Sequence, residues 1–292
     1  MMPMQLTVFF MLLYVLLSLT IVVQSTFIVA VLGREWVKVK RLSPLDMILI
    51  SLGVSKLCLQ CISIFYNFYS YFDYNYICLR VGTTWHVVNT AIFWFNSLLA
   101  VFYCVKVSSF THPIFLWLKW RISRLVPWML LGTLLISCMV CIPSTIQDHL
   151  WFQLNVKSFT ANSTMLERLS VFQQYAGIPH QIVMLMIPFL LFLASIIMLI
   201  ASLLQHWRQM KHHSPGHSSK DVHFAALKSL AIFLIFFSSY FLTVFISIIG
   251  YLFEKQSWFW IWEAVIYAGS CVHSTSLTLS SPTLRKYLKK MC

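Results

Sequence analysis

Seven apolar segments, each long enough to cross a lipid bilayer, occupy most of the 292-residue chain. A membrane-spanning α-helix needs about 20 consecutive apolar residues, because the hydrocarbon layer is roughly 30 Å thick. The segments cover residues 4–32, 44–68, 81–105, 125–147, 178–204, 226–252 and 259–280. Only helices and closed barrels satisfy their backbone hydrogen bonds in lipid. The pattern therefore predicts an all-α, polytopic membrane protein, with residues 1–292 forming a single bundle of seven transmembrane helices.

Lysine and arginine gather in clusters that follow the first, third, fifth and seventh predicted helices. The clusters lie at residues 34–41, 106–124, 208–228 and 285–290, and four basic residues in each make 16 of the 21 in the chain. Basic loops stay in the cytosol, so the pattern predicts an extracellular N-terminus and a cytoplasmic tail at residues 281–292. The net charge of +13 is then a topology signal. A nucleic-acid-binding protein would carry it on one face of a soluble domain.

The predicted extracellular connection at residues 148–177 holds the chain's one N-glycosylation sequon, Asn162-Ser163-Thr164. A sequon on the outer side of a membrane is an acceptor for an N-linked glycan, so glycosylation of Asn162 is predicted. The connection has no cysteine, which excludes a disulfide between it and Cys78 at the start of the third helix. Cys292 is either palmitoylated or a free thiol, and the sequence leaves both open.

No catalytic motif is visible in the sequence. There is no nucleophile elbow, HExxH pair, Walker loop or pair of carboxylates in one helix, and the chain has only eight acidic residues. For the histidines in the inner loop 205–225, a solvated loop is favoured over a metal site, because no ordered scaffold accompanies them. The chain is therefore predicted not to be an enzyme and to hold no metal or cofactor.

A polar and aromatic stripe runs along the outer half of the third predicted helix. His86, Asn89, Phe93 and Asn96 recur every three or four residues and share one helix face, with Trp85 beside them. Such a stripe can bind a small polar ligand or form interhelical hydrogen bonds. Ligand contact is favoured for Trp85 and Asn89, near the outer end, and interhelical bonding for Asn96, deeper in the membrane.

Other intramembrane polar groups lie in the fifth and seventh predicted helices. Because such groups are costly in lipid, they are functional candidates. His180 and Glu263 lie at the same depth as the stripe, and Trp262 is expected to reach the same cavity. An interfacial aromatic belt accounts for Trp258 and Trp260. Lys56 in the second helix is interpreted as structural.

The chain resembles the type 2 bitter taste receptors along its whole length. The most specific segment is residues 101–122, which reads VFYCVKVSSFTHPIFLWLKWRI, and further matches occur at residues 45–60, 187–210, 226–230 and 273–284. The chain departs from the usual family pattern at Ser25, Lys56 and Ser281, positions that help set the packing of inactive and active states. In close relatives an acidic residue stands at the position of His86, which predicts a difference in agonist preference or potency.

The resemblance implies a G-protein-coupled receptor for bitter small molecules in the plasma membrane, with a gustducin-type heterotrimeric G protein as its partner. Family ligand contacts match Trp85, Asn89, Tyr240 and Glu263. The residues expected to face the G protein are Tyr103, Lys106, His112, Lys119, Arg208 and Lys228, although the basic ones also follow from topology alone.

Details of the match imply β-glucopyranosides as agonists. A sugar needs hydrogen-bonding groups, and His86, Asn89, His180 and Glu263 are available. An aryl aglycone needs flat apolar surfaces, and the candidates are Trp85, Phe93, Phe241 and Trp262.

Three other interpretations of the chain remain. Another seven-helix chemosensory receptor fits the same pattern. A channel or transporter would need mid-membrane carboxylates or inverted repeats, and a membrane enzyme would need a catalytic constellation; the sequence has neither. The native agonist, the oligomeric state and the tissue of expression stay open.

Overall fold

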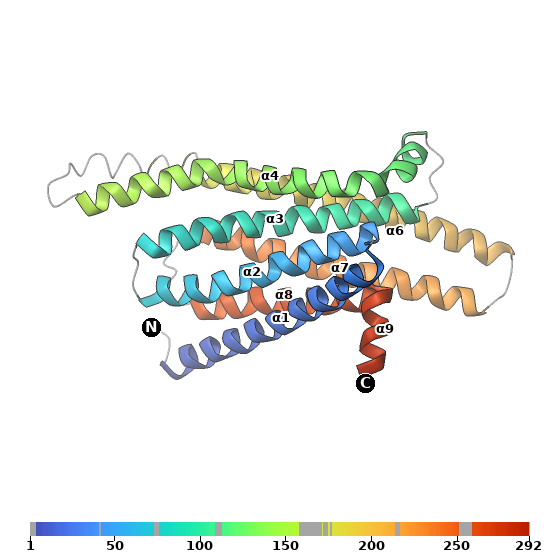
Figure 1. Cartoon of the computed structure of the whole chain (residues 1–292), viewed down its shortest axis with the longest axis horizontal. Coiled ribbons are helices and arrows are strands. Elements are labelled where there is room, and N and C mark those ends of the chain that lie inside the picture. The colour runs from blue at the N-terminus through green and yellow to red at the C-terminus, as the bar shows by residue number, and fades with distance from the viewer. Residues whose placement is uncertain are drawn as a thin grey trace.

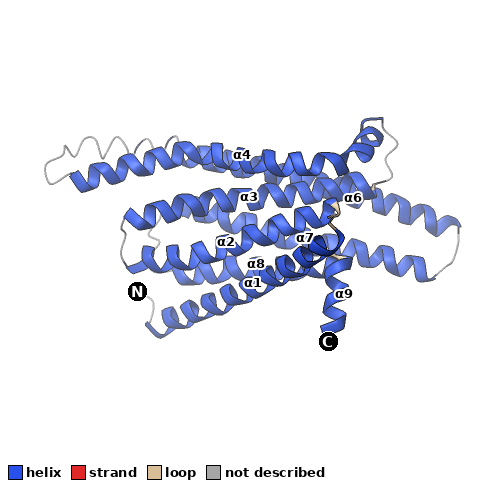
Figure 2. Ribbon diagram, in the orientation of Figure 1, coloured by secondary structure: helices blue, strands red, loops and turns tan. Residues whose placement is uncertain are grey.

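The computed structural model of the chain is a bundle of long α-helices (Figure 2). It describes residues 4–40, 42–72, 76–108, 113–157, 171, 175, 177–213, 217–250 and 259–291. No strand occurs within these ranges. The all-α class predicted from hydropathy is therefore confirmed for the described part of the chain.

Seven long helices and one short one make up the described residues. They are α1 (Met4–Val39), α2 (Pro44–Phe72), α3 (Tyr76–Val107), α4 (Pro113–Lys157), α6 (Ile178–His213), α7 (His217–Gly250), α8 (Phe259–Ser280) and α9 (Pro282–Met291). The seven long helices run along the long axis of the molecule, and α9 turns away from this axis beside α1 and α8 (Figure 1). Proline begins α2, α4 and α9, where its missing N–H costs nothing.

Five helices contain a stretch long and apolar enough to cross a membrane, judged by length and composition. These stretches are Met4–Val39, Pro44–Phe68, Val81–Val107, Phe115–Pro143 and Ile178–Gln205, and α7 adds a shorter apolar stretch, Leu230–Ile246. Several helices continue beyond the apolar segments read from the sequence. In α4, for example, the basic segment before residue 125 is helical as well.

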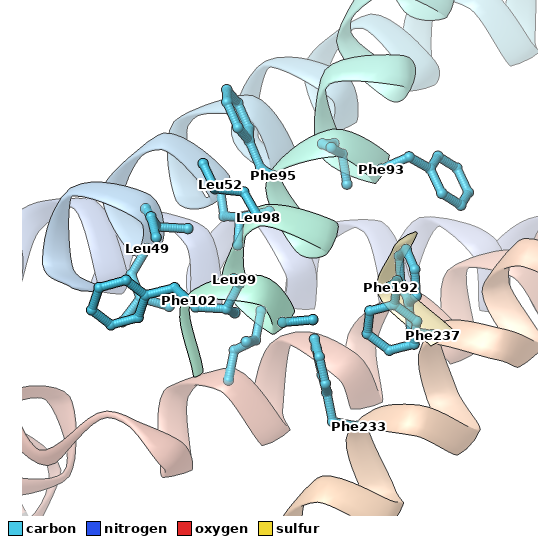
Figure 3. Packing of buried hydrophobic residues seen from close by; sticks show 14 of the residues in the cluster. Leu49, Leu52, Phe93, Phe95, Leu98, Leu99, Phe102, Phe192, Phe233 and Phe237 are labelled. Carbon is cyan, nitrogen blue, oxygen red and sulfur yellow. The ribbon is translucent and has the colours of Figure 1, made fainter. Parts of the chain in front are cut away.

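The third helix has the most central position in the bundle. It packs against α2, α4 and α6, while α1 packs against α2 and α8, and α7 closes the ring between α6 and α8. Most of α3 between Ala91 and Val105 is therefore buried, and this segment supplies Phe93, Phe95 and Leu99 to the core. In Figure 3, Leu49 and Leu52 of α2 lie on the side of Phe95 and Leu98.

Aromatic rings fill the space between α3, α6 and α7. Phe192 of α6 packs on Phe233 and Phe237 of α7, with ring centroids 5.1 and 4.3 Å apart. Phe93 of α3 reaches Phe237 at 5.4 Å. Figure 3 shows Phe192, Phe233 and Phe237 gathered on one side of the cluster. These contacts tie the three helices together by ring packing.

The short helix α9 is held against the end of α1. Leu284 is buried, and the Tyr287 hydroxyl donates a hydrogen bond to the carboxylate of Glu35. This bond is the main reason that the pKa of Tyr287 is raised above its usual value, since loss of the proton would place two negative charges side by side. The contact fixes α9 across the end of the bundle.

Gly53 marks the closest approach of α1 and α2. A Cβ atom there would lie 3.1 Å from Val29 Cγ2 and 3.2 Å from Ile28 Cγ2, whereas Gly132 of α4 has open space around it. A small residue at Gly53 therefore lets the two helix backbones pack closely.

We predict that Gly53→Leu destabilises the protein, because overpacking a tight contact costs about 1–3 kcal/mol. The measurement is thermal unfolding of the purified protein in detergent. Gly132→Leu is the matched control and should leave the unfolding temperature unchanged or slightly higher, since leucine has the better helix propensity. Equal unfolding temperatures for the two variants would contradict close packing at Gly53.

Candidate functional site

A buried carboxylate, Glu263, lies near the start of α8. Asn67 of α2 donates a hydrogen bond from Nδ2 to Glu263 Oε2 at 2.8 Å and a second one to the Tyr14 hydroxyl of α1 at 3.2 Å. All three side chains are buried. One amide therefore links α1, α2 and α8, and it provides a hydrogen-bond donor to a carboxylate that lipid would leave unsolvated.

Aromatic rings surround this polar contact. Tyr14 packs edge-on against Tyr267 of α8 at 4.9 Å and lies 5.5 Å from the Trp260 ring. Trp260 also meets Phe68 of α2 at 5.4 Å and is almost fully buried. The interfacial-belt interpretation of Trp260 is therefore wrong, because the ring packs between helices.

Trp85 of α3 faces α2. Its indole Nε1 donates to Ser63 Oγ at 2.8 Å, and its ring stacks on Tyr66 with centroids 6.3 Å apart. His86 lies edge-on against the same indole at 5.1 Å and is partly exposed. The Trp85 ring thus forms a fixed, flat surface with a partly accessible imidazole next to it.

Asn89 and Tyr240 join α3 to α7. The Tyr240 hydroxyl donates to Asn89 Oδ1 at 2.6 Å, and the Tyr240 ring stacks on Phe93 with centroids 5.2 Å apart. Phe241 lies edge-on to Phe93 at 6.4 Å and stacks closely on Phe189 of α6 at 3.7 Å. Polar and flat apolar groups therefore alternate along the junction of α3, α6 and α7.

Asn96 lies deeper in α3 and is fully buried. Its Nδ2 donates to the Ile92 carbonyl of the same helix at 2.8 Å, and its Oδ1 has no hydrogen-bond partner among the described residues. The interhelical hydrogen bond favoured from the sequence is therefore wrong for Asn96. The Asn96 NH2 group therefore finds its acceptor within α3, as short polar residues often do in helices.

The remaining candidates differ in exposure. His180, in the first turn of α6, and Trp262 of α8 are both partly exposed, and the Trp262 Nε1 is buried without a hydrogen-bond partner among the described residues. The structure brings Asn89, Phe93, Tyr240 and Phe241 together through direct or shared contacts. Trp85 contacts Ser63, Tyr66 and His86 instead. For His180 and Trp262, no direct contact with this group is observed.

Lys56 is buried at a deeper level of the bundle. Its Nζ donates to Ser274 Oγ of α8 at 2.7 Å and lies 3.0 Å from His273 Nδ1. The His273 ring in turn stacks on Phe233 of α7 at 5.1 Å. These contacts give Lys56 a structural position that joins α2 to α8, in agreement with its interpretation from the sequence.

The residues expected to face a G protein lie near the opposite ends of the helices. Lys106 and Arg208 are exposed, Tyr103 is partly buried, and Lys119 donates from Nζ to the Ser108 carbonyl at 3.3 Å. The described residues do not include His112, Asn162, Trp258, Cys292 or the side chain of Lys228. Among the groups that are described, no cluster of three His, Cys, Asp or Glu side chains is arranged to hold a metal.

Sequence reasoning missed Tyr14, Ser63 and Asn67. A signal for two of them was present, because Gln60, Ser63 and Asn67 share one face of α2 at spacings of three and four residues and are all buried. Tyr14 gives no such signal, since it is one aromatic residue in an apolar run.

Buried, hydrogen-bonded polar groups next to aromatic surfaces near one end of the helices are compatible with the binding of a small molecule. The model of the taste receptor protein family (TAS2R) matches residues 1–292. The chain therefore belongs to the taste receptor family TAS2R. Its fold is accordingly the seven-transmembrane class of that family, as the hydropathy predicted.

Relatives named taste receptor type 2 member 16 match the chain from end to end. The chimpanzee (Pan troglodytes) protein is 57% identical and the human (Homo sapiens) protein 56% identical, each over the whole of both chains. The mouse (Mus musculus) protein is 51% identical over 99% of this chain and 97% of its own length. The resemblance noted in the sequence is confirmed at the level of the family and of these relatives.

Family membership establishes several coarse properties of the chain. It is a multi-pass membrane receptor of the bitter taste family and not an enzyme. The family acts through a small-molecule agonist and a G protein. The geometry of the site can therefore be interpreted as that of an agonist receptor.

We predict that Asn67→Leu lowers the unfolding temperature of the purified receptor. The variant keeps the side-chain volume but removes a donor from a buried carboxylate, at a cost of about 1–3 kcal/mol. Ser239→Ala is the control, because that hydroxyl is exposed and bonds only to its own helix through the Ile235 carbonyl. An Asn67→Leu variant as stable as the control would show that the bond to Glu263 contributes nothing to the fold.

Proposed function

We propose that this receptor responds to β-glucopyranosides with an apolar aglycone and signals through a gustducin-type G protein at the plasma membrane. The observation that carries the proposal is the alternation of polar and flat aromatic groups along one stretch of α3. Asn89 pairs with Tyr240 there, and Phe93 stacks on Tyr240 with Phe241 edge-on to it. A glucoside likewise combines a polar sugar with an apolar aglycone.

The polar side chains of the proposed site would form hydrogen bonds with the sugar. Asn89 and Glu263 are buried and already hydrogen-bonded, so they have fixed directions, and His86 and His180 are more accessible. Hydroxyl groups of a sugar both donate and accept, and they would find an amide, an imidazole and a carboxylate within this set. His86 is the residue through which agonist preference is expected to differ from that of close relatives.

The aromatic part of the proposed site serves the aglycone. Trp85 is held by Ser63 and Tyr66, and Phe241 is stacked on Phe189. Rings held in this way lose little conformational freedom when a flat ligand packs on them. Trp262, which precedes Glu263 near the start of α8, adds a partly exposed indole. Asn96, buried and bonded within α3, is the deepest member of the proposed site.

The proposed orientation places the N-terminus outside and the basic helix ends in the cytosol. The glucoside site then opens to the extracellular side, with Asn162 as the glycosylated position. Tyr103, Lys106, His112, Lys119, Arg208 and Lys228 face the G protein. Activation is a population shift, in which the agonist binds more tightly to the state whose cytosolic face is open.

The function is tested by calcium imaging of cells that express the receptor with a gustducin-type chimeric G protein. We expect a response to salicin and weaker responses to its α-anomer and to the free aglycone, because only the β-glucoside fills both parts of the site. A response to other bitter compounds but not to β-glucosides would overturn the agonist class. Silence toward a broad bitter panel, with surface expression intact, would overturn the receptor assignment.

We predict that Trp85→Ala shifts the concentration of β-glucoside for half-maximal response upward by about tenfold or more. A tenfold change corresponds to about 1.4 kcal/mol, which is the scale of one aromatic contact. Trp36→Ala serves as the control, because it removes an exposed tryptophan near the C-terminal end of α1. An unchanged dose–response curve for Trp85→Ala would remove this residue from the site.

A further inference from the structure

The first turns of α4 carry basic and aromatic side chains on the face that points away from the bundle. Ile122 and Val126 are buried on the packing side, while Arg121 and Arg124 are exposed on the opposite side. Trp117, Trp120 and Trp128 share that outer face and are 54%, 88% and 72% exposed.

This face is continuous with the surface that meets lipid. Leu131 and Leu135 follow Trp128 on the same side of α4 and are exposed, as expected for residues in contact with hydrocarbon. From Trp117 to Trp128 the helix rises about 16 Å. The two arginines have tryptophan on both sides of them along the helix, an arrangement expected at the depth of lipid headgroups.

The described part of the protein shows no counter-charge beside these arginines. Among the described residues, Arg121 forms only a cation–π contact, with its guanidinium carbon 5.0 Å from the centroid of the Trp117 ring, and Arg124 forms no ion pair. The sequence of α4 has no acidic residue before Asp148. Among the described residues, therefore, no side chain neutralises the two guanidinium groups.

We propose that the outer face of α4, formed by Trp117, Trp120, Arg121, Arg124 and Trp128, is a binding site for an anionic phospholipid. The planar guanidinium groups pair with phosphate and carboxylate oxygens in a two-pronged manner. The tryptophan rings pack on the glycerol and upper acyl region, where amphipathic rings are most stable. Negatively charged lipids are concentrated in the cytoplasmic leaflet, on the side where positive-inside topology places this end of α4.

The test is native mass spectrometry of the purified receptor, incubated with equal amounts of palmitoyl-oleoyl phosphatidylserine and palmitoyl-oleoyl phosphatidylcholine. We expect the parent receptor to retain phosphatidylserine at least threefold over phosphatidylcholine. Equal retention of the two lipids would overturn the proposal, because it would reduce the face to an ordinary interfacial belt. This measurement needs no variant.

The double variant Arg121→Gln/Arg124→Gln locates the preference. It should lose the excess of phosphatidylserine, while Arg208→Gln/Arg285→Gln, which removes two exposed arginines from α6 and α9, should keep it. Equal loss in both double variants would indicate a general charge effect and contradict a site on α4. Inorganic phosphate added in excess should not displace the lipid, since binding also uses the aromatic and acyl contacts; displacement would contradict a lipid site.

Discussion

Hydrocarbon offers no hydrogen-bond partner, so a polar side chain inside this bundle is stabilised when it finds one within the protein. Serine and threonine largely do so within their own helix, as Ser137 does with the Thr133 carbonyl. The polar contacts between helices are therefore few and local. Lys56 joins α2 to α8 at one level, and the Asn67–Glu263 and Tyr240–Asn89 pairs form a second level nearer the start of α8. The arrangement of the bundle depends on these pairs, because ring packing alone tolerates rotation of one helix against another.

The same constraint explains why the proposed agonist site is where it is. A buried amide or carboxylate that is already hydrogen-bonded stays in a fixed direction, and it can exchange that partner for a ligand hydroxyl at small net cost. Asn89 and Glu263 have this property, with Tyr240 and Asn67 as their partners in the absence of a ligand. The Phe93 ring is fully buried and stacked on Tyr240, so a ligand can pack on it only if Tyr240 moves. In the proposed site, the atoms that form these structural hydrogen bonds would also recognise the ligand.

The sequence predicted the class of fold because hydropathy measures the very property that lipid selects. It did not predict how far α4 extends, since the basic residues before position 125 continue the helix outside the apolar segment. The sequence also did not predict which side chains of different helices contact each other. The periodicity of α3 identified Asn89 and Phe93 as sharing a face, but only the packing of α3 against α7 pairs them with Tyr240. Trp260 is a second example. The sequence alone does not distinguish a tryptophan at the membrane interface from one that packs against α1 and α2, as Trp260 does.

The central position of α3 gives a physical route between the two ends of the receptor. Asn89 and Phe93 contact α7, and one turn further Ser97 donates to the Pro188 carbonyl of α6 at 2.5 Å. Proline at that position leaves the helix α6 with one backbone donor fewer, so this segment is adaptable where α3 touches it. A ligand that replaced the Tyr240–Asn89 bond would change how α7 sits on α3. Tyr103 lies further along α3, and both Tyr103 and Leu230 of α7 pack against the cluster of Cys104, Leu199 and Leu203. A shift of α7 against α3 at the proposed site would therefore also affect the packing near the proposed cytosolic end.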